Sequence, residues 1–208
     1  MTRALVVDYG VGNLHSVANA LGREGAEVRV SARPEDVRSA DRVILPGVGA
    51  FGDGMRALRQ RELDVALRDF ARSGRPLLGI CLGMQLLLDE SEEFGRHEGL
   101  GIVSGQVRLL RPGSPHKVPH VGWTRMGPAE GRSWQNTPFA SLQPGAVVYF
   151  VHSYHACPTD HARRLAEAGY GGESVCAALL ADNVLGCQFH PEKSGPTGLA
   201  ILREFLRW

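Results

Sequence analysis

The fold is decided by residues 76–88, which read Pro-Leu-Leu-Gly-Ile-Cys-Leu-Gly-Met-Gln-Leu-Leu-Leu. The first half is a buried apolar run and the second half carries a helical pattern, so the stretch predicts a strand, a tight turn and a helix. Cys81 stands at the turn. Gly79 and Gly83, two residues to either side, allow the backbone to turn sharply without a Cβ clash. Serine takes the corresponding place in hydrolases with a Gly-x-Ser-x-Gly elbow.

A cysteine at such a turn is well placed to act as a nucleophile. The following helix directs its positive end and its free N–H groups toward the thiol, which favours the reactive thiolate. A free cysteine is more often a small buried hydrophobe. We apply that interpretation to Cys176 and Cys187, which lie in apolar runs, and to Cys157, which precedes a proline in a predicted loop. The glycine-flanked corner favours the nucleophile for Cys81.

Composition limits the classes of protein that fit. The chain has 208 residues, enough for one domain with its own core, and a net charge of +1, which gives no field to recruit nucleic acid or a membrane surface. No apolar stretch reaches transmembrane length, and four cysteines without paired spacing argue against a disulfide or zinc framework. The chain opens on a strand-like segment instead of a signal peptide. We therefore expect one domain, residues 1–208, in a reducing cytoplasm.

The first half of the chain alternates between apolar strands and amphipathic helices. We predict strands at 4–8, 27–30, 42–45 and 76–80, and helices at 13–24 and at 54–73, the latter broken near Arg61. Such alternation is typical of a parallel sheet covered on both faces. The expected fold class is α/β, with a central, mostly parallel sheet and helices on both faces.

The second half predicts additional strands. They are expected at 103–110, 120–126, 146–151, 174–181 and 183–189, with a hairpin turn at 181–183. Residues 196–208 carry apolar side chains at helical spacing and predict a closing helix.

A thiolate nucleophile needs a base, and the base needs an orienting group. His190 follows a predicted strand, and Pro191 favours an extended backbone for it. Residues i and i+2 of an extended chain point the same way, so Glu192 can hold the imidazole. Strand ends gather at the ligand crevice of open α/β sheets. Cys81, His190 and Glu192 are therefore the expected catalytic triad.

The other histidines fit the role of the catalytic base less well. His152 and His155 have no carboxylate at a comparable offset, and His116 and His120 lie four residues apart in a Pro/Gly-rich loop without an evident third ligand. We therefore predict no metal site.

An acyl-transfer site also needs donors for the developing oxyanion. The N–H of Leu82 is one candidate. Gly49, in the glycine-rich segment 46–52 after the third strand, is the second, although the segment alone also fits a plain turn. A further glycine pair at Gly10 and Gly12 lacks the third glycine of a dinucleotide fingerprint, so nucleotide binding is weakly supported.

Six segments together match a known family. They are Asp-Tyr-Gly-Val-Gly-Asn-Leu (8–14), Pro-Gly-Val-Gly-Ala-Phe (46–51), Gly-Ile-Cys-Leu-Gly-Met-Gln (79–85), Val-Pro-His-Val-Gly-Trp (118–123), Tyr-Phe-Val-His-Ser-Tyr (149–154) and Gln-Phe-His-Pro-Glu-Lys-Ser-Gly (188–195). The chain resembles the class I glutamine amidotransferases and, more narrowly, the glutaminase subunits of imidazole glycerol phosphate synthase. One departure is Thr124, where the family usually has asparagine after Gly-Trp.

The resemblance implies a flavodoxin-like fold, with additional antiparallel strands in the C-terminal half, and a function. It implies that L-glutamine is hydrolysed through a γ-glutamyl thioester and that ammonia passes to a separate (β/α)8-barrel cyclase in histidine biosynthesis. It implies no cofactor. Matching positions place Gln85 and the segment Val151, His152, Ser153 and Tyr154 at the glutamine pocket, and Asn13 and Lys193 at the partner interface.

Two alternatives stay open at this point. The same fold and thiol could serve another ammonia acceptor, such as that of vitamin B6 or anthranilate synthesis, although the segments at 118–123 and 149–154 argue against it. A catalytically silent binding module is the other, and the complete set of Cys81, His190 and Glu192 argues against that.

Overall fold

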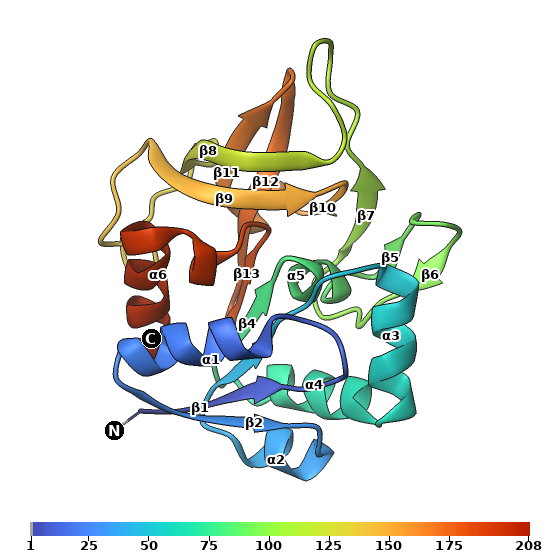
Figure 1. Ribbon diagram of the computed structural model, residues 1–208, viewed down its shortest axis with the longest axis vertical. Coiled ribbons are helices and arrows are strands. Elements are labelled where there is room, and N and C mark those ends of the chain that lie inside the picture. The colour runs from blue at the N-terminus through green and yellow to red at the C-terminus, as the bar shows by residue number, and fades with distance from the viewer. Residues whose placement is uncertain (1) are drawn as a thin grey trace.

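A nine-stranded sheet runs through the computed structural model, which describes residues 2–208 (Figure 1). The strand order is β2 (Ala26–Ser31), β1 (Thr2–Val7), β3 (Val43–Leu45), β4 (Leu77–Ile80), β13 (Val184–Cys187), β12 (Glu173–Ala181), β11 (Arg164–Tyr170), β8 (His120–Pro128) and β9 (Ala146–His152). The first five strands pair in parallel, and the remaining pairings are antiparallel. The predicted fold class is confirmed.

Helices cover both faces of the parallel part. Figure 1 shows α1 (Leu14–Arg23) beside α6 (Gly195–Arg207). The other face carries α2 (Pro34–Ser39), α3 (Phe51–Gln60), α4 (Leu63–Arg72) and α5 (Leu82–Leu86). Alternate residues of β1 divide between the two buried cores: Ala4 and Val6 pack with α1 and α6, and Leu5 and Val7 pack with the other helices. Apolar residues on both faces explain the near-continuous apolar run of β1.

A second, smaller sheet lies beside the first. Its order is β10 (Tyr154–Pro158), β7 (Gly105–Leu109), β5 (Glu90–Ser91) and β6 (His97–Glu98). Two short 3₁₀ turns, η1 (His161–Arg163) and η2 (Pro191–Lys193), complete the elements. Cys157 lies within β10, so the predicted loop there is wrong. Because β10 is an edge strand that pairs with β7, Pro158 can end it without breaking a ladder on the other side.

Most predicted elements are present, with shifted ends. The helical region after residue 51 is broken as predicted: α3 ends at Gln60, and Glu62 takes a left-handed conformation, with φ +56°, before α4. The hairpin turn is also confirmed, since Ala181 pairs with Val184 around Asp182 at φ +53°. The sequence analysis missed α2, β5, β6, β10 and β11.

Candidate active site

The corner between β4 and α5 holds Cys81 in an unusual backbone conformation, with φ +53° and ψ −109°. Such strain persists only where the surroundings enforce it, and it is common at functional sites. Gly79 and Gly83 make the corner possible. A Cβ on Gly79 would lie 2.8 Å from the Gly83 carbonyl oxygen, and a Cβ on Gly83 would clash with the carbonyl oxygen of Leu45. Both positions therefore require glycine, as predicted, because neighbouring backbone packs too closely to leave room for a Cβ atom.

Sheet register brings the histidine to the cysteine. β4 and β13 are parallel neighbours with Ile80 opposite Cys187, and the Cys81 N–H donates to the Cys187 carbonyl at 2.7 Å. The chain leaving β13 therefore passes beside the corner. His190 is extended there, with φ −99°, and its N–H donates to the Tyr149 carbonyl of β9 at 3.0 Å.

The His190 imidazole is held by Glu192. Nδ1 lies 2.8 Å from Oε1 of the carboxylate, and the two side chains are 2% and 1% exposed. Because a carboxylate accepts, Nδ1 carries the proton and Nε2 is left as the basic nitrogen. Within residues 2–208, Nε2 has no hydrogen-bond partner. Burial lowers the pKa of His190, but its interactions with the Cys81 and Glu192 charges outweigh burial and raise the pKa to about 9.

Cys81 itself is enclosed, with 6% of its surface exposed. Its Sγ lies 3.9 Å from the Val151 carbonyl oxygen at the end of β9, and Nε2 of Gln188 approaches it at 3.9 Å. The structure therefore brings together the three predicted catalytic side chains in a site that is nearly closed to solvent.

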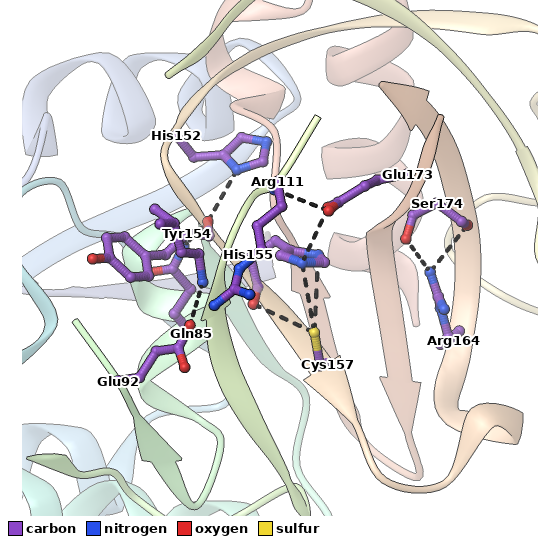
Figure 2. Close-up of polar contacts among 11 residues, drawn as sticks. Gln85, Glu92, Arg111, His152, Tyr154, His155, Cys157, Arg164, Glu173 and Ser174 are labelled. Carbon is purple, nitrogen blue, oxygen red and sulfur yellow. Dashed lines mark hydrogen bonds and ion pairs between the residues drawn. The ribbon is translucent and has the colours of Figure 1, made fainter. Parts of the chain in front are cut away.

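A network of amides and one histidine extends from the cysteine. Gln85 Nε2 donates to the Tyr154 carbonyl at 2.8 Å and to Gln188 Oε1 at 3.2 Å. His152 Nδ1 lies 3.0 Å from the same carbonyl, as Figure 2 shows. Four of the five predicted pocket residues thus gather near Cys81: Gln85, Val151, His152 and Tyr154. Ser153 lies between β9 and β10, where its carbonyl accepts from the Leu110 N–H at 2.9 Å.

The predicted oxyanion segment lies against the start of α5. A Cβ on Gly47 would be 3.0 Å from Leu82 Cβ, so this backbone touches the helix whose first free N–H belongs to Leu82. Gly49 has φ +101°, a conformation that side chains rarely adopt, and it is exposed. Leu82 therefore stands at the corner, and the segment that holds Gly49 contacts it through Gly47.

Two residues that the sequence analysis missed hold this segment. The Tyr9 hydroxyl donates to the Pro46 carbonyl at 2.7 Å, and the Glu93 carboxylate accepts from the Phe51 N–H at 2.6 Å where α3 begins. Burial and then the negative charge of Cys81 raise the pKa of Tyr9. The position of Tyr9 just beyond a strand end could have indicated its place, but no local pattern marks Glu93.

Three other histidines lie in two clusters outside the triad. Figure 2 shows His155 with Cys157 and Glu173: His155 Nε2 is 3.6 Å from the Cys157 sulfur and 4.0 Å from a Glu173 oxygen. Tyr170 stacks on His120 with 3.9 Å between ring centroids and meets the His116 ring edge-on. Within residues 2–208, no group of three or more His, Cys, Asp or Glu side chains is arranged to hold a metal ion.

The predicted interface residues lie on neighbouring elements, because α1, which Asn13 caps, contacts the η2 turn that holds Lys193. Lys193 is exposed directly after Glu192, at the end of η2. Asn13 caps α1, where its side-chain oxygen accepts from the Ser16 N–H at 3.3 Å. The departure at Thr124 has a local effect, because its hydroxyl lies 2.8 Å from His120 Nε2.

Comparison with known proteins decides the family. The class-I glutamine amidotransferase model matches residues 5–208. The chain belongs to this family. Across 212 aligned residues the chain is 46% identical to the imidazole glycerol phosphate synthase subunit HisH 1 of Legionella pneumophila (strain Lens), covering 100% of both chains. It is 45% identical to HisH of Sulfurimonas denitrificans, covering 98% of this chain and 97% of that one.

Solved structures of more distant proteins share the fold. The structure of PurLQS from Thermotoga maritima superposes with a TM-score of 0.76 at 21% identity, covering 99% of this chain and 97% of that chain. A crystal structure described as glutamine amidotransferase gives a TM-score of 0.73 at 18% identity, covering 98% and 99%. Within residues 2–208, no helix has the length and apolar character needed to cross a membrane.

Proposed function

We propose that this chain is the glutaminase subunit of an imidazole glycerol phosphate synthase, acting in histidine biosynthesis in the cytoplasm. The observation that carries the proposal is the strained Cys81 corner beside the buried His190–Glu192 pair, in a chain that matches HisH relatives along its whole length. Residues 1–208 act as one domain, because both buried cores share the same sheet. The relatives favour this acceptor over those of vitamin B6 or anthranilate synthesis.

The reaction begins with proton transfer from Cys81 to His190 Nε2, while Glu192 keeps the proton of Nδ1 in place. The thiolate attacks the side-chain carboxamide carbon of L-glutamine, and the carbonyl oxygen becomes an oxyanion. His190 then protonates the departing nitrogen, which leaves as ammonia. Water, deprotonated by the same imidazole, cleaves the γ-glutamyl thioester, so glutamate leaves and the thiol is restored.

The surrounding residues bind and orient the substrate. The N–H groups of Leu82 and Gly49 stabilise the oxyanion, which accounts for glycine at a position with φ +101°. Gln85 and residues 151–154 line the glutamine pocket, and the Gln85 amide already holds the Tyr154 carbonyl in place.

Ammonia needs an acceptor subunit, and we infer a barrel-type cyclase that binds near Asn13 and Lys193. Two exposed apolar side chains of β8 support a partner-binding surface: Val121 is 54% exposed and Trp123 is 58% exposed. The Trp123 ring packs edge-on against Tyr149, whose carbonyl accepts from the His190 N–H. A partner that covers this surface would therefore lie within one strand of the triad.

The proposal is tested by mixing the chain with a barrel-type cyclase and measuring complex stoichiometry and glutamate release. Because Cys81 is 6% exposed, we expect slow glutamate release from the isolated chain and faster release in the complex with the cyclase ligand bound. A one-to-one complex with accelerated release supports the proposal. Absence of a complex, or no glutamate release from it, would overturn the assignment.

A further inference from the structure

We propose that Gln188 is a further catalytic residue, whose side-chain amide donates a hydrogen bond to the Cys81 sulfur and stabilises its thiolate form. The inference rests on the proposed function only in taking Cys81 as the nucleophile. Sequence reasoning gave Gln188 no role of its own.

The position of Gln188 is fixed by the sheet. It directly follows β13, is 0% exposed, and its N–H donates to the Ala177 carbonyl at 2.9 Å. A fully buried amide needs partners for its polar atoms. The partner of its nitrogen is the Cys81 sulfur at 3.9 Å, a distance that suits a weak hydrogen bond to a thiol and tightens when the acceptor becomes charged.

The orientation of the amide follows from the groups around it. The Tyr154 carbonyl can only accept, so the atom of Gln85 that faces it is the nitrogen. That nitrogen carries a second hydrogen, which points to the nearest Gln188 atom at 3.2 Å and requires an oxygen there. The Gln188 nitrogen must then face Cys81. A reversed amide would place two donors against each other and an oxygen against the sulfur.

A backbone carbonyl near the sulfur explains why such a donor is needed. The Val151 oxygen lies 3.9 Å from Sγ and accepts from the thiol, so it favours the protonated form. Once the proton moves to His190, that carbonyl dipole opposes the negative sulfur. The Gln188 N–H groups offset this effect, because hydrogen bonding to the charged form favours ionisation.

The test measures the pH dependence of Cys81 alkylation by iodoacetamide in the full-length chain, with mass spectrometry to separate Cys81 from the partly exposed Cys157. Gln188→Met keeps the length of the side chain and removes the donor. We expect the midpoint of the alkylation profile to rise by about one pH unit, which is about tenfold less thiolate at neutral pH. An unchanged midpoint in the folded variant overturns the proposal.

Two further variants keep the test decisive if Gln188→Met does not fold. Gln188→Glu preserves the shape but sets an acidic group beside the sulfur, so the midpoint must rise at least as far. Gln85→Met leaves Gln188 in place and removes the bond that orients its amide, so a smaller rise is expected. If neither folded variant raises the midpoint, the proposal is wrong.

A matched control lies at the other end of the same strand. Asn183 directly precedes β13, at the end opposite Gln188, and its amide donates to the Ala71 and Arg75 carbonyls. Asn183→Met should lower the thermal midpoint without moving the alkylation profile. Alkylation needs neither glutamine nor the cyclase, so an unchanged Gln188→Met profile refutes this inference alone. Failure of the proposed function is seen separately, in missing glutamate release.

Discussion

Replacing Glu192 with glutamine removes the charge that orients the base and leaves the shape of the side chain almost unchanged. In the wild type, Glu192 Oε1 accepts from His190 Nδ1 at 2.8 Å, and both side chains are nearly fully buried. If the new amide presents its nitrogen, the imidazole proton must move to Nε2 and the base is lost. If the amide presents its oxygen, the tautomer is kept but the charge is lost.

The smaller of these effects sets the minimum loss. A hydrogen bond to a charged group contributes about 1.5–3 kcal/mol, and each 1.36 kcal/mol changes a rate about tenfold. The glutamine-dependent kcat of Glu192→Gln should therefore fall at least about 10- to 150-fold. Because the carboxylate helps raise the pKa of His190 to about 9, this pKa should fall in the variant, and the alkaline limb of the pH profile should move to lower pH.

The pH dependence of the unfolding free energy gives a second test of the role of Glu192. The folded pKa of His190 lies above its ordinary value, so this group stabilises the fold fully below about pH 6.5, and the contribution is lost as the pH rises through about 9. The difference in unfolding free energy between wild type and Glu192→Gln should therefore shrink over this window, as measured by urea denaturation.

The assay is glutamine-driven cyclisation in the complex, compared with the same reaction driven by ammonium salts. Ammonium-driven turnover should be unchanged, since it bypasses the triad. Glu98→Gln is the matched control: its side chain is 88% exposed, and its activity should equal that of the wild type. A Glu192→Gln variant within twofold of wild type in the glutamine-driven reaction would refute the orienting role.

Three further predictions concern packing, the oxyanion segment and acid stability. Gly83→Ala should destabilise the fold by about 1–3 kcal/mol or more in urea denaturation, because its Cβ would clash with a strand carbonyl, whereas Gly22→Ala, in open space on α1, should be neutral or stabilising. Gly49→Ala should lower glutamine-driven kcat by at least about tenfold and spare ammonium-driven turnover; equal loss in both would contradict its role. Burial and then the nearby His116 lower the pKa of His120 to about 4, so the wild type should lose stability as the pH falls from about 6.5 toward 4, and His120→Phe should flatten this loss in denaturation at pH 7 and pH 5.

The catalytic residues could be predicted from short, local stretches of sequence. The Gly-x-Cys-x-Gly corner and the His-Pro-Glu run are contiguous, so backbone rules alone connect their residues. Two strand ends sufficed to bring Cys81 to His190, because parallel neighbours in the sheet end on the same edge.

Contacts between residues far apart in the sequence could not be predicted, because they depend on how the strands pair. Gln188 meets Gln85 across 103 residues of sequence, and Glu93 meets Phe51 across 42, with no local pattern to indicate either pairing. β11 was missed for another reason. Its buried positions include Ala166 and Ala168, and alanine gives a weak apolar alternation and has low β propensity.

The most direct test of the central claim is Cys81→Ala in the reconstituted complex with the barrel-type cyclase, with cyclisation measured from glutamine and from ammonium salts. The account predicts that the variant loses glutamate release and glutamine-driven cyclisation while ammonium-driven cyclisation stays at the wild-type level. Retained glutamine-driven turnover, or equal loss with both nitrogen sources, would contradict it.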